Sequence, residues 1–224
     1  MKKISLLFLS VFLAISSFSQ VTLGLRLAPA FCINRVNDTK NDNLEFSNNG
    51  SSVRFAFGPT VDFKFGDNYA FSTGAWYTST RAGLTIKNTD PSVLYTYKEV
   101  VSLQSVQIPI TFKAYTNEIT TNMKLYFQLG SLASINFYEK FKESDPSTSG
   151  DYDTKYNVFD VSLYFGAGVS YKVGESNAIF GGLFYNRGLM NQFDGSTVSG
   201  TNLKLKDNAK YNTDLIGLEV GVTF

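Results

Sequence analysis

Charged side chains are the main candidates for chemistry in this sequence, because its 224 residues include no histidine. That absence removes the Ser–His–Asp triads of many hydrolases and the histidine ligands of most catalytic zinc sites. A pair of carboxylates could still act as acid and base, but no two acids stand in a recognisable context. The sequence therefore predicts no catalytic residues, no metal or cofactor site, and no enzyme.

Nine charged residues stand singly at alternate positions within apolar stretches. They are Arg26, Arg54, Asp62, Lys64, Lys113, Lys124, Asp160, Lys172 and Glu219. This alternation predicts a polar face inside a barrel, where a buried charge needs a partner. Arg26 and Glu219 lie at similar depth in the first and last stretches, so we expect them to pair. The others would join similar networks or reach water at the rims, either as a structural plug or as a gated path for protons or ions.

The strands that would position these residues have a clear period of two. From Val53 to Phe65 every odd position is apolar and every even one is polar or small. That length exceeds the length of most soluble strands and fits a tilted membrane strand. The eight predicted strands run over Val21–Ala28, Val53–Phe65, Tyr69–Tyr77, Val106–Lys113, Met123–Ile135, Phe159–Lys172, Ala178–Leu189 and Ile216–Phe224.

The connections between these strands alternate between short and long. The long ones cover 34–52, 82–105, 138–157 and 190–210. Short periplasmic turns and long extracellular loops are typical of bacterial outer-membrane barrels. We therefore predict an all-β, eight-stranded antiparallel up-and-down transmembrane barrel.

A soluble ligand-binding barrel would alternate in the same way, with its apolar face inward. An eight-stranded barrel has room inside only for packed side chains or one small ligand, and the apolar set here is too large to fit. The complementary set is rich in Gly, Ala, Ser and Thr. We therefore expect the apolar face to contact outer-membrane lipid.

The N-terminus predicts export. Basic residues at Lys2 and Lys3 precede an apolar run over 4–15 and a small-residue stretch, which is typical of a secretory signal peptide. We expect a signal peptide over 1–19 and a barrel domain over 20–224. The net charge of +1 gives no reason to expect a nucleic-acid partner.

Glycine and proline residues within two of the predicted strands indicate local structural effects. Gly166-Ala167-Gly168 lies within a strand and is expected to make room for a bulky inward neighbour such as Tyr126 or Trp76. Pro109 also lies within a strand and is expected to cause a local irregularity there.

Three stretches carry a family resemblance. They are VQIPITFK at 106–113, FDV at 159–161 with GAGVSY at 166–171, and YNRGLMN at 185–191. Together they resemble the PorT-type outer-membrane β-barrel family, in which L-E-I-P, F-D-x-G…G-A-G and Y-S-Y-G-L-x-N strands occur in this order. The resemblance implies an outer-membrane barrel and, through the founding member, a role in type IX protein secretion.

The predicted second and third long loops are rich in aromatic residues. These residues are Tyr95, Tyr97, Tyr138, Phe141, Tyr152 and Tyr156. They predict either a surface for a protein partner or strands that extend past the membrane. Our leading hypothesis is a structural or interaction scaffold in the cell outer membrane. The alternative is a narrow pore or a transporter of small solutes or ions, although a lumen filled by side chains excludes bulk diffusion.

Overall fold

The computed structural model describes residues 20–38, 44–88, 95–144, 156–174, 177–193 and 209–224, so the predicted signal peptide lies outside the described residues. No helix within these ranges has both the length and the hydropathy needed to cross a membrane. The strands are β1 (Gln20–Asp38), β2 (Leu44–Asn48), β3 (Ser52–Lys64), β4 (Tyr69–Gly74), β5 (Trp76–Asn88), β6 (Tyr95–Tyr115), β7 (Met123–Ser144), β8 (Phe159–Lys172), β9 (Ala178–Gly188) and β10 (Ala209–Thr223).

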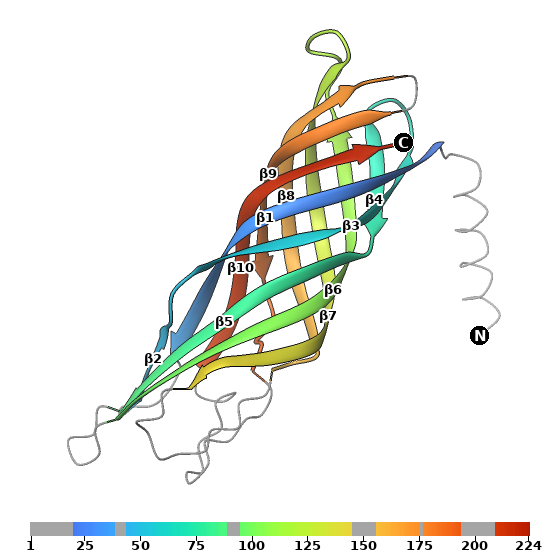
Figure 1. Cartoon of the computed structure of the whole chain (residues 1–224). Coiled ribbons are helices and arrows are strands. Elements are labelled where there is room, and N and C mark those ends of the chain that lie inside the picture. Colours follow the sequence, from blue (N-terminus) through green and yellow to red (C-terminus); the bar gives the residue numbers. More distant parts are fainter. Residues whose placement is uncertain (1–19, 39–43, 89–94, 145–155, 175–176, 194–208) are drawn as a thin grey trace, which may run out of the picture.

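The strands close into a barrel (Figure 1). All pairings are antiparallel, and β1 pairs with both β3 and β10, which joins the two edges of the sheet. β4 and β5 share one position in the ring, because both pair with β3 on one side and β6 on the other. The ring therefore has eight positions in up-and-down order, and the predicted fold is confirmed. The short β2 extends the sheet beside β5.

The barrel has two distinct ends. The turn end holds the short connections at 65–68 and 116–122, together with Gln20 and Phe224. The loop end holds β2 and the opposite ends of the long strands, such as Asp38 of β1 and Asn88 of β5.

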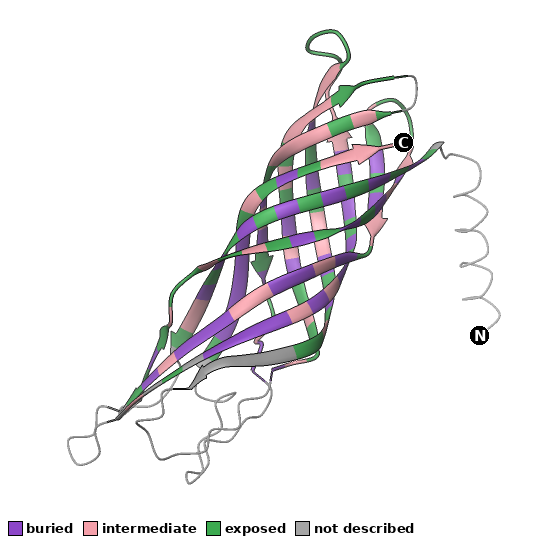
Figure 2. Ribbon diagram, viewed as in Figure 1, coloured by how far each residue is buried: buried purple, intermediate pink, exposed green. Residues whose placement is uncertain are grey.

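The barrel wall is apolar outside and polar inside over the half nearest the turn end. In β1, Val21, Leu23, Leu25 and Leu27 are each more than half exposed, whereas Arg26 between them is 5% exposed. Exposed and buried residues alternate in the same way along β3 (Figure 2). Such an apolar outer surface is stable only in contact with lipid.

Glycines on two neighbouring strands make room for a tyrosine of a third. Gly168 of β8 lies opposite Tyr126 of β7 and opposite Gly182 of β9. A Cβ atom at either glycine would lie 2.7 Å from the Tyr126 hydroxyl oxygen. The predicted role of the 166–168 glycines is confirmed for Gly168 and Tyr126, and Gly182 adds to it.

The irregularity expected at Pro109 lies mainly on the neighbouring strand. Pro109 pairs in continuous register with Leu132 of β7, so the prediction is wrong for that side. On its other side, the register of β6 places it opposite Gly74, where β4 ends and Ala75 separates it from β5. Because proline has no amide hydrogen, it cannot complete the ladder at this point.

At the loop end the strands run farther than predicted. β5 continues to Asn88 and β6 begins at Tyr95, so most of the predicted loop over 82–105 is strand. β1 extends to Asp38 and β7 to Ser144, which also shortens the predicted loops over 34–52 and 138–157. The predictions stopped too early because the chemistry of the two faces changes along these strands.

Beyond the lipid-facing part, the inward face becomes apolar. On β5 the inward residues Leu84 and Ile86 are buried, while Lys87 is exposed. They belong to a group that we call the loop-end cluster. Its members are Phe46, Ala82, Leu84, Ile86, Val101, Leu103, Tyr156, Phe193 and Tyr211. An apolar inside with a polar outside is the pattern of a barrel wall that stands in water.

We expect the folded protein to migrate faster on an SDS gel when it is not boiled, because a closed ladder leaves no strand edge for the detergent to open. A comparison of boiled and unboiled outer-membrane fractions tests this. Leu218→Pro is the matched variant, because it removes one amide hydrogen from the ladder of β10, and it should lose the fast band. Identical bands for the unmodified protein in both samples would contradict a closed barrel.

Candidate functional site

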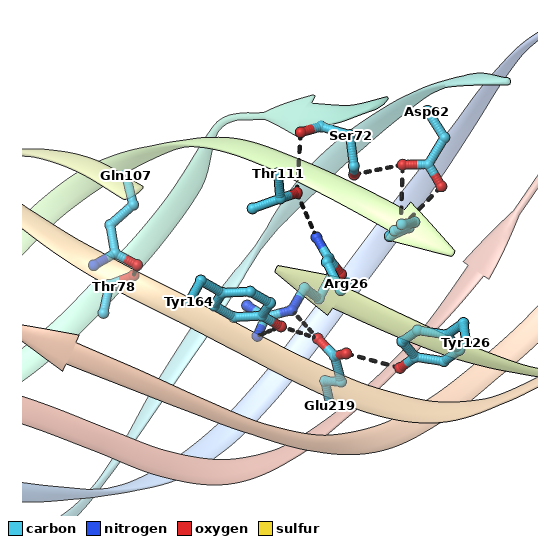
Figure 3. A network of polar contacts seen from close by, with 11 residues as sticks. Arg26, Asp62, Ser72, Thr78, Gln107, Thr111, Tyr126, Tyr164 and Glu219 are labelled. Carbon is cyan, nitrogen blue, oxygen red and sulfur yellow. Dashed lines mark hydrogen bonds and ion pairs between the residues drawn. The ribbon is translucent and has the colours of Figure 1, made fainter. Parts of the chain in front are cut away.

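The middle of the barrel interior is filled by the ion pair that the sequence predicts. Arg26 Nε of β1 donates to Glu219 Oε2 of β10 at 2.6 Å, and both side chains are at most 3% exposed. Tyr126 and Tyr164 each donate a hydroxyl hydrogen at 2.7 Å, one to each oxygen of the same carboxylate. Figure 3 shows these four residues, which we call the plug. Three donors bind the two oxygens of the Glu219 carboxylate, so this group holds the plug together.

Aromatic rings enclose the guanidinium of Arg26. Its carbon Cζ lies 4.1 Å from the centroid of the Trp76 ring and 4.7 Å from that of Phe184. The Tyr164 ring stacks on Phe184 at 5.9 Å, and Arg26 Nη2 donates to the Tyr164 hydroxyl at 3.1 Å. Cation–π contacts of this kind gain strength where water is excluded. The arginine is therefore held by rings as well as by its counter-charge.

A second buried ion pair lies closer to the turn end. Lys113 Nζ of β6 is 2.9 and 3.1 Å from the two carboxylate oxygens of Asp62 on β3. Ser72 of β4 also donates to Asp62. Thr111 donates to the backbone oxygen of Ser72 and accepts a hydrogen bond from Gln128 of β7. This network links strands on one side of the barrel (Figure 3).

The other predicted lumen charges form no ion pair with any residue that the structure describes. Arg54 donates to two serine hydroxyls, and Lys124 donates to a backbone carbonyl. Asp160 accepts a hydrogen bond from a glutamine amide at 3.1 Å. Lys64 and Lys172 lie at the rim of the turn end, where water is accessible. The nine residues therefore share an inward face without forming one continuous network.

A cavity of about 980 Å³ occupies the turn end of the lumen. Four lysines line it, namely Lys64, Lys113, Lys124 and Lys172. Its inner wall includes Tyr126, whose hydroxyl bonds to Glu219 of the plug. The cavity can hold water and ions, and it ends at the plug.

Tyr156, expected either on a partner surface or on a strand that extends past the membrane, is instead buried outside the named strands. It is 4% exposed, and its ring centroid lies 5.9 Å from that of Phe193 and 6.4 Å from that of Tyr211. The prediction for Tyr156 is wrong because it treated this segment as a solvated loop. The residue instead contributes to the loop-end cluster.

The structure describes the side chains of only some of the other predicted loop aromatics. Tyr138 lies on β7 and is 46% exposed. Tyr95 and Tyr97 lie on β6 and Phe141 on β7, but their side chains fall outside the described part of the structure. Tyr152 lies outside the described residues altogether. Of these six aromatics, Tyr138 is the one whose side chain the structure describes as exposed.

The prediction missed two of the residues around Arg26. Tyr164 lies at an even position of β8 between Ser162 and Gly166, so alternation alone places it inward. Phe184 lies in a stretch of β9 where Gly181 and Gly182 blur the two faces. Alternation in the sequence was enough to place Tyr164 inward. The inward orientation of the Phe184 side chain, by contrast, depends on the register of β9.

We expect Glu219→Ala to cost about 3–5 kcal/mol in the free energy of unfolding, because it leaves the Arg26 charge buried without a partner. Urea unfolding of the refolded barrel in lipid vesicles measures this loss. A double variant, Arg26→Met with Glu219→Met, should recover most of it, because apolar residues of similar volume can replace a buried pair. An equal loss in both variants would show that packing, and not charge pairing, stabilises the plug.

Comparisons with known proteins agree with this architecture. A family model described as "Outer membrane protein beta-barrel domain" matches residues 18–194. Among solved structures, the outer membrane protein OprG from Pseudomonas aeruginosa is similar, with 13% sequence identity, 92% of this chain and 97% of that chain covered, and a TM-score of 0.55.

Neisserial surface protein A also matches, with 16% identity, 91% of this chain and 95% of that chain covered, and a TM-score of 0.47. A search of curated proteins found no match. At these identities the likeness to solved structures concerns the fold alone. The family model covers well over half of the chain, and the chain therefore belongs to the family of outer-membrane proteins with this β-barrel domain.

Proposed function

We propose that this integral outer-membrane barrel is a closed, non-catalytic scaffold that presents its loop end to a protein partner. The observation that carries the proposal is the double closure of the lumen. The plug fills the middle of the barrel with side chains that are nearly fully buried. The loop-end cluster fills the interior beyond it with apolar side chains. A barrel filled in this way acts through its outer surface and its ends.

The strands at the loop end form a rigid extension of the barrel above the lipid, which we call the platform. Its strands continue the wall, their inward face is an apolar core, and outward residues such as Lys87 and Lys98 are exposed. A core of this kind holds the wall rigid in water without help from the membrane. Rigid strands lower the ordering cost of binding a partner.

A β-bulge on β7 gives this platform an exposed aromatic pair. Gln104 of β6 pairs with Tyr138, and Ser105 pairs with Asn136, so Phe137 is the extra residue. Phe137 and Tyr138 are 56% and 46% exposed, although they are consecutive. A bulge redirects side chains in this way, and paired exposed aromatics are typical anchors of protein interfaces.

We also propose the sidedness and the route of export. A signal peptide over 1–19, cleaved before Gln20, would deliver the barrel domain 20–224 to the periplasm. The short turns would then face the periplasm and the loop end the cell exterior, as is usual in bacterial outer-membrane barrels.

The partner that we propose belongs to the type IX protein secretion machinery. The motifs at 106–113, 159–171 and 185–191 support this assignment, since together they resemble the PorT-type family. In this role the barrel would be an accessory that holds another component of the machinery at the membrane.

We expect a photo-cross-linking amino acid at position 138 to capture a protein partner in intact cells, because this side chain stands at the exposed bulge. Position 171 is the matched control, because Tyr171 is 43% exposed but lies at the turn end. Immunoblotting and mass spectrometry of the adducts measure the outcome. Secretion components at position 138 alone support the proposal.

Adducts of equal yield at both positions would contradict a partner bound at the loop end. Adducts at position 138 with proteins unrelated to secretion would retain the scaffold and reject the type IX role.

A second candidate function, a narrow pore or a transporter of small solutes or ions, is favoured by the cavity of about 980 Å³ that reaches the plug from the turn end. In planar bilayers we expect no channel conductance from the unmodified protein, because the Arg26–Glu219 pair blocks the passage. Arg26→Ala combined with Glu219→Ala removes this block, and the loop-end cluster should still keep the conductance low. Discrete channels in the unmodified protein would favour the pore.

A further inference from the structure

A second, much smaller cavity lies in the lumen and is lined almost entirely by polar side chains. Its volume is about 20 Å³, and its lining includes Thr80, Ser105, Asp160, Ser162 and Asn186. A space of this size holds one water molecule or one small ion. It shares no lining residue with the large cavity at the turn end.

Three oxygen atoms in this lining have no hydrogen-bond partner. They are Asp160 Oδ1, Ser162 Oγ and Asn186 Oδ1, and all three are buried. Ser162 and Asn186 are 3% and 4% exposed as whole residues. Buried polar atoms are nearly always paired, so three unpaired oxygens around one space indicate that something occupies it.

The sheet register explains why these oxygens come together. Asp160 and Ser162 are two residues apart on the same face of β8. Asn186 of β9 lies opposite Tyr164, the next residue of β8 on that face. The three side chains are therefore neighbours on the inner wall and are held by rigid strands. This geometry does not depend on any loop.

Charge distinguishes Asp160 from the other two acids described inside the lumen. Asp62 and Glu219 each have a cationic partner, at 2.9 Å and 2.6 Å. The described part of the chain provides no cationic partner for Asp160, whose carboxylate accepts hydrogen bonds from the Gln192 amide and from the backbone amides of Val161 and Met190. A water molecule would complete its hydrogen bonding, whereas a cation would also balance the charge of the ionised carboxylate.

We propose that this cavity binds one monovalent alkali cation of the size of sodium, held by Asp160, Ser162 and Asn186. All three offer oxygen, the ligand atom that hard cations prefer. One carboxylate balances one positive charge, while divalent cations usually take several carboxylates. The bound ion would complete the polar interior between the plug and the loop-end cluster.

Sodium titration of the purified barrel in a non-ionic detergent tests this. Ionic strength is held constant with N-methyl-D-glucamine chloride, and the fraction folded after heating is read from the unboiled band on a gel. We expect the midpoint temperature to rise with sodium and to saturate, because a ligand bound to the folded state alone stabilises it. Asp160→Asn should abolish the rise. Asp67→Asn, which changes an exposed carboxylate at the turn end, should retain it.

A direct measurement on the unmodified protein keeps the proposal falsifiable if Asp160→Asn does not fold. Sodium-23 NMR should show line broadening by the folded barrel, and added lithium or potassium should reverse it by competition. No broadening, together with equal midpoints in sodium and N-methyl-D-glucamine, would mean that the cavity holds water only and would overturn the proposal. The same rise in Asp160→Asn as in the unmodified protein would also overturn it.

Discussion

The backbone hydrogen bonds between β1 and β10 are the contact on which the rest of the barrel depends. In hydrocarbon every amide and carbonyl must find a partner within the protein, so a sheet that crosses a membrane has to close. The register from Gly24 opposite Thr223 to Asp38 opposite Ala209 provides this closure. It also brings Arg26 and Glu219 within bonding distance. The polar plug is thus a product of the same closure that satisfies the backbone.

The medium outside the wall determines which face of each strand is apolar. Near the turn end the outward residues are apolar and the lumen holds charge, whereas at the loop end Leu84 and Ile86 point inward and Lys87 points outward. The strands continue through this change, and β7 accommodates extra residues in its pairing with β6 as it does so. The protein therefore combines a membrane barrel and a small water-exposed barrel in one continuous sheet.

The sequence was sufficient for the ring of eight strands and for the Arg26–Glu219 pair, because both follow from alternation and from the position of each residue along its strand. The Asp62–Lys113 pair depends on register across β3, β4 and β6, which sequence spacing alone does not determine. Tyr156 was misplaced because it lies just before β8 in a segment that was interpreted as a solvated loop, whereas it packs into the loop-end cluster. The cavity beside Asp160 could not be foreseen, because its lining comes from six strands, β5 to β10, whose side chains meet only through the sheet register.

The Arg26–Glu219 pair has a consequence for assembly. Its two residues are 193 positions apart, on the first and last strands of the ring. Contacts of such long sequence separation form late and slow folding. Until β10 docks, the Arg26 charge has no carboxylate to neutralise it, and an open sheet carries that charge in its unfinished lumen. An incomplete barrel therefore carries the cost of an unpaired charge, and docking of β10 removes that cost.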